Sequence, residues 1–306
     1  IVTSIIGCDS ALNGKYTVGS HNSDFATLDD ALDLLSKCGV IGPVVFELAS
    51  GYYNALDLRN NIIGSSNTNT ITFVSASGNA SSVIIGSNSL TAISLLNISH
   101  LRFTNITIGS LTSSTNYGVR FGGYCENIEF YGCNIYANNS STSSTTAAVY
   151  YNNASNSSIY LRNISFVKNN ISGGYYNMYL YYPAGATSNM LPTAAKRSII
   201  RIDSNVLTDA YYYGIYSYQY SYYPSISYNT IIARSSSNYF YGMYLNYYNT
   251  IDTCMNNKIN LINNTYSYGI YSYYLNYNSS YGATGPCIVA NNEIISLNGT
   301  YTYGIY

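Results

Sequence analysis

A short motif recurs through most of the chain at intervals of roughly 30 residues, which is a period typical of solenoid proteins. In the clearest copies a Tyr-Gly pair precedes a large aliphatic residue, as in Tyr268-Gly269-Ile270. The aliphatic positions of the seven copies are Val119, Val149, Met178, Ile215, Met243, Ile270 and Ile305. A unit this short cannot bury its apolar face alone, but stacked units share one continuous core. The repeat therefore predicts a solenoid.

A second mark, an asparagine shortly before an aliphatic residue, falls between these motifs. Its copies are Asn105-Ile106, Asn134-Ile135, Asn170-Ile171, Asn205-Val206, Asn229-Thr230-Ile231, Asn257-Lys258-Ile259 and Asn292-Glu293-Ile294. Each unit thus contains at least two short strands, which favours a β-solenoid. We interpret the asparagines as buried amides that stack from coil to coil and satisfy backbone groups.

The first 50 residues have a different character. From Ala26 to Leu35 the apolar residues mostly follow helical spacing, and Gly39 is a suitable end. We predict a helix at about 25–37, with Asp24 as its N-cap. The predicted organisation is an N-terminal cap segment at 1–50 and β-helix coils at 51–306.

The best-matching unit, from Tyr268-Gly269-Ile270-Tyr271 through Ala290-Asn291-Asn292-Glu293-Ile294, resembles the right-handed parallel β-helix repeat proteins. The resemblance covers roughly Ile71 to Tyr306, and the segment from Tyr16 to Phe46 is similar to the N-terminal cap of secreted β-helix proteins in bacterial cell-surface adhesins. It implies an all-β fold, a single-stranded right-handed parallel β-helix with a short N-terminal capping helix. It also implies an extracellular or cell-surface location. Because the sequence stops within a repeat, at Tyr303–Tyr306, we expect further chain or another subunit to cover that end.

Strand alternation places the residue after each aliphatic mark on the outer face of the coil. These residues form a predicted outward file of Tyr150, Tyr179, Tyr216, Tyr244, Tyr271 and Tyr306. Two residues further on, Tyr181, Tyr218 and Tyr273 begin a second file, in which Asn152 and Asn246 occupy the other coils. Two explanations stay open. Tyrosine is a good strand former whose cross-strand pairs stabilise a sheet. A contiguous aromatic surface is also typical of an interaction site for another copy, a partner or a sugar ring.

The charge balance and the lengths of the apolar runs each argue against one class of protein. Twelve Lys and Arg residues oppose thirteen Asp and Glu residues, and the net charge is -1. Without a basic run, the electrostatic attraction that dominates nucleic-acid binding has no source. No apolar run approaches the roughly 20 residues that a transmembrane helix needs. We therefore expect neither a nucleic-acid partner nor a transmembrane segment.

The chain has six cysteines and no Cys-x-x-Cys pair, and its histidines are His21 and His100. A metal site is therefore not expected. An even count in an apparently secreted chain favours disulfides, here Cys8 with Cys38, Cys254 with Cys287 and, by elimination, Cys125 with Cys133. Free buried thiols are the alternative.

Several sites match glycosylation signals. The Asn-x-Ser/Thr candidates are Asn79, Asn97, Asn105, Asn153, Asn163, Asn263, Asn278 and Asn298, and Ser10 lies in a short segment that resembles an O-glycosylation signal. In a chain so rich in Asn, Ser and Thr, such matches are common by chance.

No catalytic residues stand out. The acidic residues after Asp57 are scattered, and the signatures of the pectin-hydrolase branch of the β-helix enzymes are absent. The best charged cluster is Arg197, Arg201, Asp203 and Asp209, which could hold a uronic acid. We prefer a solvated loop boundary as its explanation, because no second carboxylate or histidine converges on it in sequence. We expect no cofactor. The leading hypothesis is a non-enzymatic extracellular structural protein, a subunit of a self-assembling surface filament or an adhesin stalk. The alternative is a carbohydrate-binding or polysaccharide-cleaving β-helix.

Overall fold

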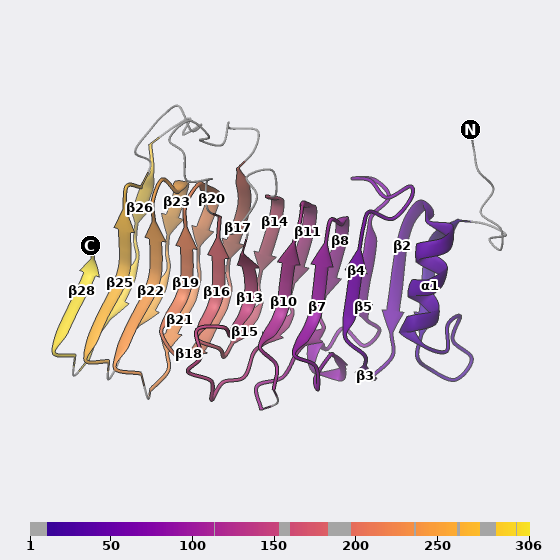
Figure 1. The fold of residues 1–306 in the computed structure, drawn as a ribbon, viewed down its shortest axis with the longest axis horizontal. Coiled ribbons are helices and arrows are strands. Elements are labelled where there is room, and N and C mark those ends of the chain that lie inside the picture. The colour runs from indigo at the N-terminus through magenta and orange to yellow at the C-terminus, as the bar shows by residue number, and fades with distance from the viewer. Residues whose placement is uncertain are drawn as a thin grey trace.

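The computed structural model describes residues 11–112, 114–152, 160–182, 197–235, 237–261, 264–275, 286–297 and 299–306. The chain winds as a right-handed parallel β-helix in which successive coils contribute one strand to each of three parallel sheets (Figure 1). Strand pairing is parallel throughout the three sheets. The predicted fold class is confirmed.

The ten-stranded sheet forms one wall of the coils. Its strands, in spatial order, are β1 (Leu12–Val18), β2 (Val40–Leu48), β5 (Ile71–Ser75), β8 (Ser99–Thr104), β11 (Cys125–Tyr131), β14 (Leu161–Val167), β17 (Ser198–Asp203), β20 (Ser221–Ser227), β23 (Thr250–Met255) and β26 (Ile288–Ala290). Since β1 and β2 pair with each other and β2 pairs with β5, residues before position 50 already belong to this sheet.

The other two walls have nine strands each. The short-strand sheet consists of β3 (Gly51–Tyr53), β6 (Val83–Ile85), β9 (Thr107–Ile108), β12 (Asn134–Tyr136), β15 (Asn170–Ser172), β18 (Val206–Ala210), β21 (Thr230–Ala233), β24 (Lys258–Asn260) and β27 (Glu293–Ile295). The tyrosine sheet consists of β4 (Leu56–Arg59), β7 (Thr91–Leu96), β10 (Tyr117–Gly122), β13 (Ala147–Asn152), β16 (Tyr176–Tyr181), β19 (Tyr213–Tyr218), β22 (Tyr239–Asn246), β25 (Tyr266–Tyr273) and β28 (Tyr301–Ile305).

The interior is a single apolar core in which like residues stack from coil to coil. Five phenylalanines of the ten-stranded sheet, Phe46, Phe73, Phe103, Phe130 and Phe166, form an internal column with ring centroids 4.9 to 5.5 Å apart. All five are fully buried. Removing this much aromatic surface from water is a main source of stability in a fold whose coils contact only their neighbours.

The helix α1 (Leu28–Cys38) lies at the N-terminal end of the coils, beside β1 and β2 (Figure 1). It begins three residues later than predicted. Its N-cap is Thr27, whose hydroxyl accepts a hydrogen bond from the backbone N–H of Asp30 in a capping box, whereas Asp24 accepts hydrogen bonds from Thr17. Gly39 ends the helix with a φ of 68°, a conformation that favours glycine.

The Tyr-Gly-aliphatic motif has a steric explanation at the glycine. A Cβ on Gly242 would lie 2.6 Å from the carbonyl oxygen of Gly269 in the next coil and 2.6 Å from Cγ2 of Ile259. Gly214 is restricted in the same way, by the corresponding glycine of the next coil and by the isoleucine of an asparagine mark. The two sequence marks are therefore linked, because the isoleucine of one packs against the glycine of the other.

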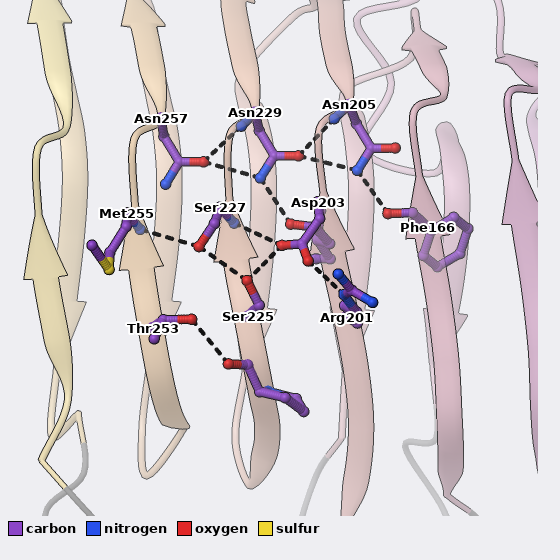
Figure 2. A network of polar contacts seen from close by, with 12 residues as sticks. Phe166, Arg201, Asp203, Asn205, Ser225, Ser227, Asn229, Thr253, Met255 and Asn257 are labelled. Carbon is purple, nitrogen blue, oxygen red and sulfur yellow. Dashed lines mark hydrogen bonds and ion pairs between the residues drawn. The ribbon is translucent and has the colours of Figure 1, made fainter.

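Four of the seven predicted asparagine marks belong to a ladder of stacked side-chain amides, which is buried at every rung except the last. Its rungs are Asn169, Asn205, Asn229, Asn257 and Asn292, and each rung donates from its backbone N–H and its side-chain Nδ2 to Oδ1 of the next at 2.9 to 3.0 Å. Three rungs are shown in Figure 2. The register differs from the prediction in three coils. Asn169 replaces the predicted Asn170, and the backbone of Cys133 takes the place predicted for Asn134. Asn105 lies outside the ladder, and its backbone N–H donates to the carbonyl oxygen of Tyr131.

Candidate binding groove and tyrosine face

The outward residues of the tyrosine sheet align in rows that run along the axis. One row passes in register from Asp57 on β4 through Ser94 on β7 and Arg120 on β10 to Tyr150 on β13. From Tyr150 it continues through the predicted tyrosine file. The row therefore changes from charged and polar to aromatic at a single step, between β10 and β13.

The predicted file is confirmed as one continuous stack. Successive centroids from Tyr150 to Tyr306 are 4.9 to 5.4 Å apart, and neighbouring rings lie within 14° of parallel. The second predicted file is also in register, from Asn152 through Tyr181, Tyr218 and Asn246 to Tyr273. Within it, Tyr181 and Tyr218 stack at 5.1 Å, whereas Tyr273 contacts Tyr247 edge-on.

A further column was not predicted. It consists of the tyrosines that begin the repeat motif, Tyr176, Tyr213, Tyr241, Tyr268 and Tyr303, with centroids 4.7 to 5.2 Å apart. These rings meet the first file edge to face, as Tyr241 does with Tyr244 at 90°. The signal was present in the motif itself, because a residue at a fixed place in every coil must stack on its copies.

The crowding of phenols makes them hard to ionise. Burial, followed by the charges of neighbouring tyrosinates, raises the pKa of Tyr213 and Tyr216 well above the ordinary tyrosine value. The same causes raise the pKa of Tyr241 to about 12. At neutral pH the columns are therefore uncharged, and their hydroxyls can both donate and accept hydrogen bonds.

Stacking also decides which part of each ring a ligand can reach. A ring inside the file has both faces covered by its neighbours, as Tyr179 and Tyr244 cover Tyr216 at interplanar angles of 1° and 2°. A ligand on this face therefore meets ring edges and phenolic hydroxyls. The expected use of these tyrosines as flat sugar platforms does not fit this geometry, whereas hydrogen bonding to the hydroxyl edge does.

A groove of about 450 Å³ lies at the N-terminal end of this face, over β4, β7, β10 and β13. Its polar lining consists of Arg59, Ser94, Arg120, Tyr150 and Asn152. Gly122, which carries no side chain, also lines the groove. The amide of Asn152 donates to the Tyr150 hydroxyl at 3.1 Å, which fixes both groups at the wall. The volume falls within the range of small-molecule binding sites.

The two arginines of the groove differ in their partners. Arg59 forms a salt bridge with Asp57, with Nη2 2.8 Å from Oδ2 and Nε donating to both carboxylate oxygens. Arg120 forms no ion pair with any described residue, and its guanidinium lies 5.7 Å from the centroid of Tyr117. The groove thus offers one guanidinium whose charge is not neutralised.

The charged cluster predicted from the sequence does not assemble as one site. Asp203 is 6% exposed and is held by Arg201, by the Ser225 hydroxyl at 2.6 Å and by the backbone N–H of Ser227 at 3.0 Å (Figure 2). Its Oδ1 therefore joins β17 to β20, while its Oδ2 is paired with Arg201 on β17 itself. Asp209 instead accepts a hydrogen bond from Ser172, on the short-strand sheet.

Arg197 lies apart from the rest of the predicted cluster and contacts different residues. Its guanidinium lies 4.1 Å from the ring centroid of Tyr222, whose hydroxyl donates to Asp252. Burial lowers the pKa of Arg197, an effect opposed by Tyr222 and Asp252. The sequence could not show this arrangement because the three residues come from three different coils.

Two of the three predicted disulfides are not formed. Cys125, Cys133, Cys254 and Cys287 are free thiols, and the first three are buried. Cys125 and Cys133 lie on the same coil but donate to separate backbone carbonyls, of Leu95 and Phe103 respectively. Cys38 is disulfide-bonded, and Cys8 lies outside the described residues.

The glycosylation candidates fall into two groups. Asn79, Asn97 and Asn163 are exposed and Asn105 is half-buried. Asn79 caps a short 3₁₀ helix, Ala80–Ser82, and Asn97 accepts a hydrogen bond from the backbone of Tyr124. Asn153, Asn263, Asn278, Asn298 and Ser10 lie outside the described residues.

No three His, Cys, Asp or Glu side chains of the described ranges converge in a way that could hold a metal ion. No helix in that part of the chain is long and apolar enough to cross a membrane.

Comparison with known proteins gives a fold likeness. No protein-family model and no curated protein sequence matches the chain. A pectin methylesterase from Aspergillus niger has a similar structure, with a TM-score of 0.56 and 15% identity over 93% of this chain and 87% of that one. A pectin methylesterase from carrot has a TM-score of 0.51 and 12% identity over 99% of this chain and 90% of that one.

These comparisons correct the leading functional hypothesis. We predicted a non-enzymatic filament subunit or adhesin stalk, and no matching family supports the adhesin similarity. The two structures that share the fold over most of their length are carbohydrate-active enzymes, which contradicts both the structural role and the expected lack of enzymatic activity.

Proposed function

We propose that this chain is a carbohydrate-active β-helix that binds an acidic polysaccharide in the groove over β4, β7, β10 and β13. The observation that carries the proposal is Arg120, a guanidinium without a carboxylate partner among the described residues, placed beside Tyr150 in a groove of about 450 Å³. Arginine binds carboxylates through paired, parallel hydrogen bonds. A uronic acid residue presents such a carboxylate on a ring of hydroxyls.

The surroundings of Arg120 suit the rest of such a ligand. Ser94, Tyr150 and Asn152 supply a hydroxyl, a phenol and an amide for sugar hydroxyls. The tyrosine file extends the same row toward β28 with ring centroids about 5 Å apart. A pyranose unit has a similar length, so a bound polymer would follow the axis of the β-helix. The likeness to pectin methylesterases supports a carbohydrate ligand of this kind.

The groove supports binding more directly than cleavage of the chain. Hydrolysis of a glycosidic bond ordinarily uses a pair of carboxylates. The described residues place one carboxylate, Asp57, beside the groove, and Arg59 holds both of its oxygens.

Binding of polygalacturonate, measured by isothermal titration calorimetry, tests the proposal. Arg120→Gln should weaken binding about tenfold, since a hydrogen-bonded charge pair contributes roughly 1.5 kcal/mol or more. The matched control is Arg102→Gln, because Arg102 is also exposed and without an ion pair in the described chain but lies on β8 of the ten-stranded sheet. Equal affinity of wild type and Arg120→Gln would contradict the proposal, as would an equal loss in Arg102→Gln.

Enzymatic activity can be examined on the same samples. Methanol release from methyl-esterified pectin reports ester hydrolysis, and new chain ends report cleavage. Activity that falls in Arg120→Gln but not in Arg102→Gln would place the reaction in this groove.

A further inference from the structure

Tyr52, on β3 of the short-strand sheet, is the most exposed large hydrophobic side chain among the described residues, at 79%. Its neighbour Tyr53 is anchored, because the Tyr53 hydroxyl donates to the carbonyl oxygen of Ala49 at 2.8 Å. Tyr52 has no such anchor, and no described aromatic ring stacks on it. It therefore differs from the tyrosine file, because no described aromatic ring covers either of its faces.

Three surface hollows share the Tyr52 side chain as a wall. The largest, of about 780 Å³, is bordered by Asn54 and by the turns after β6 and β9, with Ser87, Asn88 and Ser110. A second, of about 300 Å³, extends over Thr107 toward β12. A third, of about 230 Å³, lies between β3 and the start of α1. The ring thus stands between concave surfaces near the N-terminal end of the coils, where Figure 1 shows β3.

The polar groups of these hollows are almost all uncharged. Serine, threonine and asparagine side chains dominate, and no lysine or arginine contributes. The one charged group is Asp29, whose Oδ2 accepts a hydrogen bond from the Asn54 amide at 2.9 Å. A carboxylate at this place disfavours an anionic ligand.

Several of these polar groups have no partner within the described chain. The side chains of Ser87, Asn88 and Ser89 make no hydrogen bond to any described residue, whereas Thr107 donates to the carbonyl oxygen of Ala80. Their donors and acceptors are available to a ligand that lies against Tyr52.

We propose that Tyr52 and the hollows around it form a binding site for a neutral saccharide. A pyranose has an apolar C–H face that packs on an aromatic ring and a rim of hydroxyls that hydrogen-bond to serine and asparagine side chains. This site lies on the short-strand sheet, whereas the arginine groove lies on the tyrosine sheet. The proposal therefore does not depend on the function proposed for the groove.

Calorimetric titration of the whole chain with five neutral hexasaccharides, based on cellulose, xylan, mannan, starch and galactan, tests this site. We expect at least one to bind the wild type, and Tyr52→Ala to weaken that binding about tenfold or more. The matched control is Tyr228→Ala, since Tyr228 is 63% exposed and lies on the turn between β20 and β21. Both variants should keep the wild-type melting temperature, because neither side chain is part of the core.

Three results would overturn the proposal. One is that no neutral hexasaccharide binds the wild type. Another is that Tyr52→Ala binds as tightly as the wild type, or that Tyr228→Ala loses as much affinity. The third is that the double variant Arg59→Gln, Arg120→Gln abolishes binding of the neutral sugar, which would assign that binding to the groove. Loss of polygalacturonate binding in this double variant, with neutral binding kept, would confirm two separate sites.

Discussion

Arg120 and Tyr150 occupy matching positions on the adjacent parallel strands β10 and β13. Every later residue of this row, from Tyr179 to Tyr271, is a tyrosine, and the two earlier ones are Ser94 and Asp57. One face of the regular backbone therefore presents two kinds of surface. The first is a polar and cationic groove, and the second is an aromatic surface whose exposed edge consists of phenolic hydroxyls. Because the frame itself does not change, the difference lies in one side chain per coil.

Gly242→Ala should destabilise the fold by about 1 to 3 kcal/mol, because the new methyl group would overlap a backbone carbonyl and Ile259. Gly304→Ala is the control in the same motif, since its Cβ would meet only Cδ1 of Ile294, at 3.9 Å. Urea unfolding followed by circular dichroism measures the difference. Equal midpoints for the two variants would contradict the steric explanation of the motif.

Asn229→Ala should cost at least about 3 kcal/mol of unfolding free energy. Truncation leaves the backbone N–H and the Nδ2 of Asn205 without their acceptor and the carbonyl oxygen of Ile202 without its donor, all in the interior. Asn61→Ala is the control, because Asn61 is exposed and lies outside the ladder. Similar melting curves for the two variants would show that the ladder contributes little.

The tyrosine columns predict a loss of stability in alkali. Their pKa values are raised in the folded state, so the unfolded chain releases protons more readily above its ordinary tyrosine pKa near 10. Stability from this source is complete below pH 10 and falls as the pH rises toward the folded-state values, near 12 for Tyr241. Thermal unfolding from pH 8 to 12, alongside tyrosinate absorbance, measures it. A melting temperature that stays constant up to pH 12 would contradict the prediction.

The free cysteines should react unequally with a thiol reagent. Burial raises the pKa of Cys125 to about 11 and that of Cys133 and Cys254 to about 12, whereas Cys287 is only half-buried. We therefore expect Cys287 to be alkylated first in the native protein and all four in denaturant. Peptide mass spectrometry after brief alkylation identifies the modified residue. Rapid native labelling of Cys133 would contradict its burial.

Periodicity made the fold predictable, because a residue that recurs once per coil must stack on its own copies. The repeat predicted Ile215, Met243 and Ile270 as inward residues, and all are buried. The ladder register was wrong at Asn170 because two asparagines are adjacent there, and the sequence alone did not show that Asn169 is the inward one. The helix start was wrong because Asp24 and Thr27 are both good N-caps, and the capping box with Asp30 favours Thr27.

The groove was missed although a signal existed. The rule that found the tyrosine file, the residue after each aliphatic mark, gives Arg120 when it is applied to Val119 one coil earlier. Asp57 and Arg59 precede the repeat, so no periodic pattern connects them to Arg120. The predicted cluster around Asp203 relied on closeness in sequence, which in a coiled chain often places residues on different walls.

The asparagine ladder also gives the β-helix a dipole moment along its axis. In each rung the side-chain carbonyl oxygen receives its hydrogen bonds from the N-terminal neighbour, and Nδ2 donates to the C-terminal one. The amide dipoles therefore point the same way and add along the axis, and each hydrogen bond polarises the next. A buried row of small neutral groups thus behaves as an aligned dipole, with its positive end toward β27, and the two ends of the coil stack are electrostatically different even though the row itself carries no net charge.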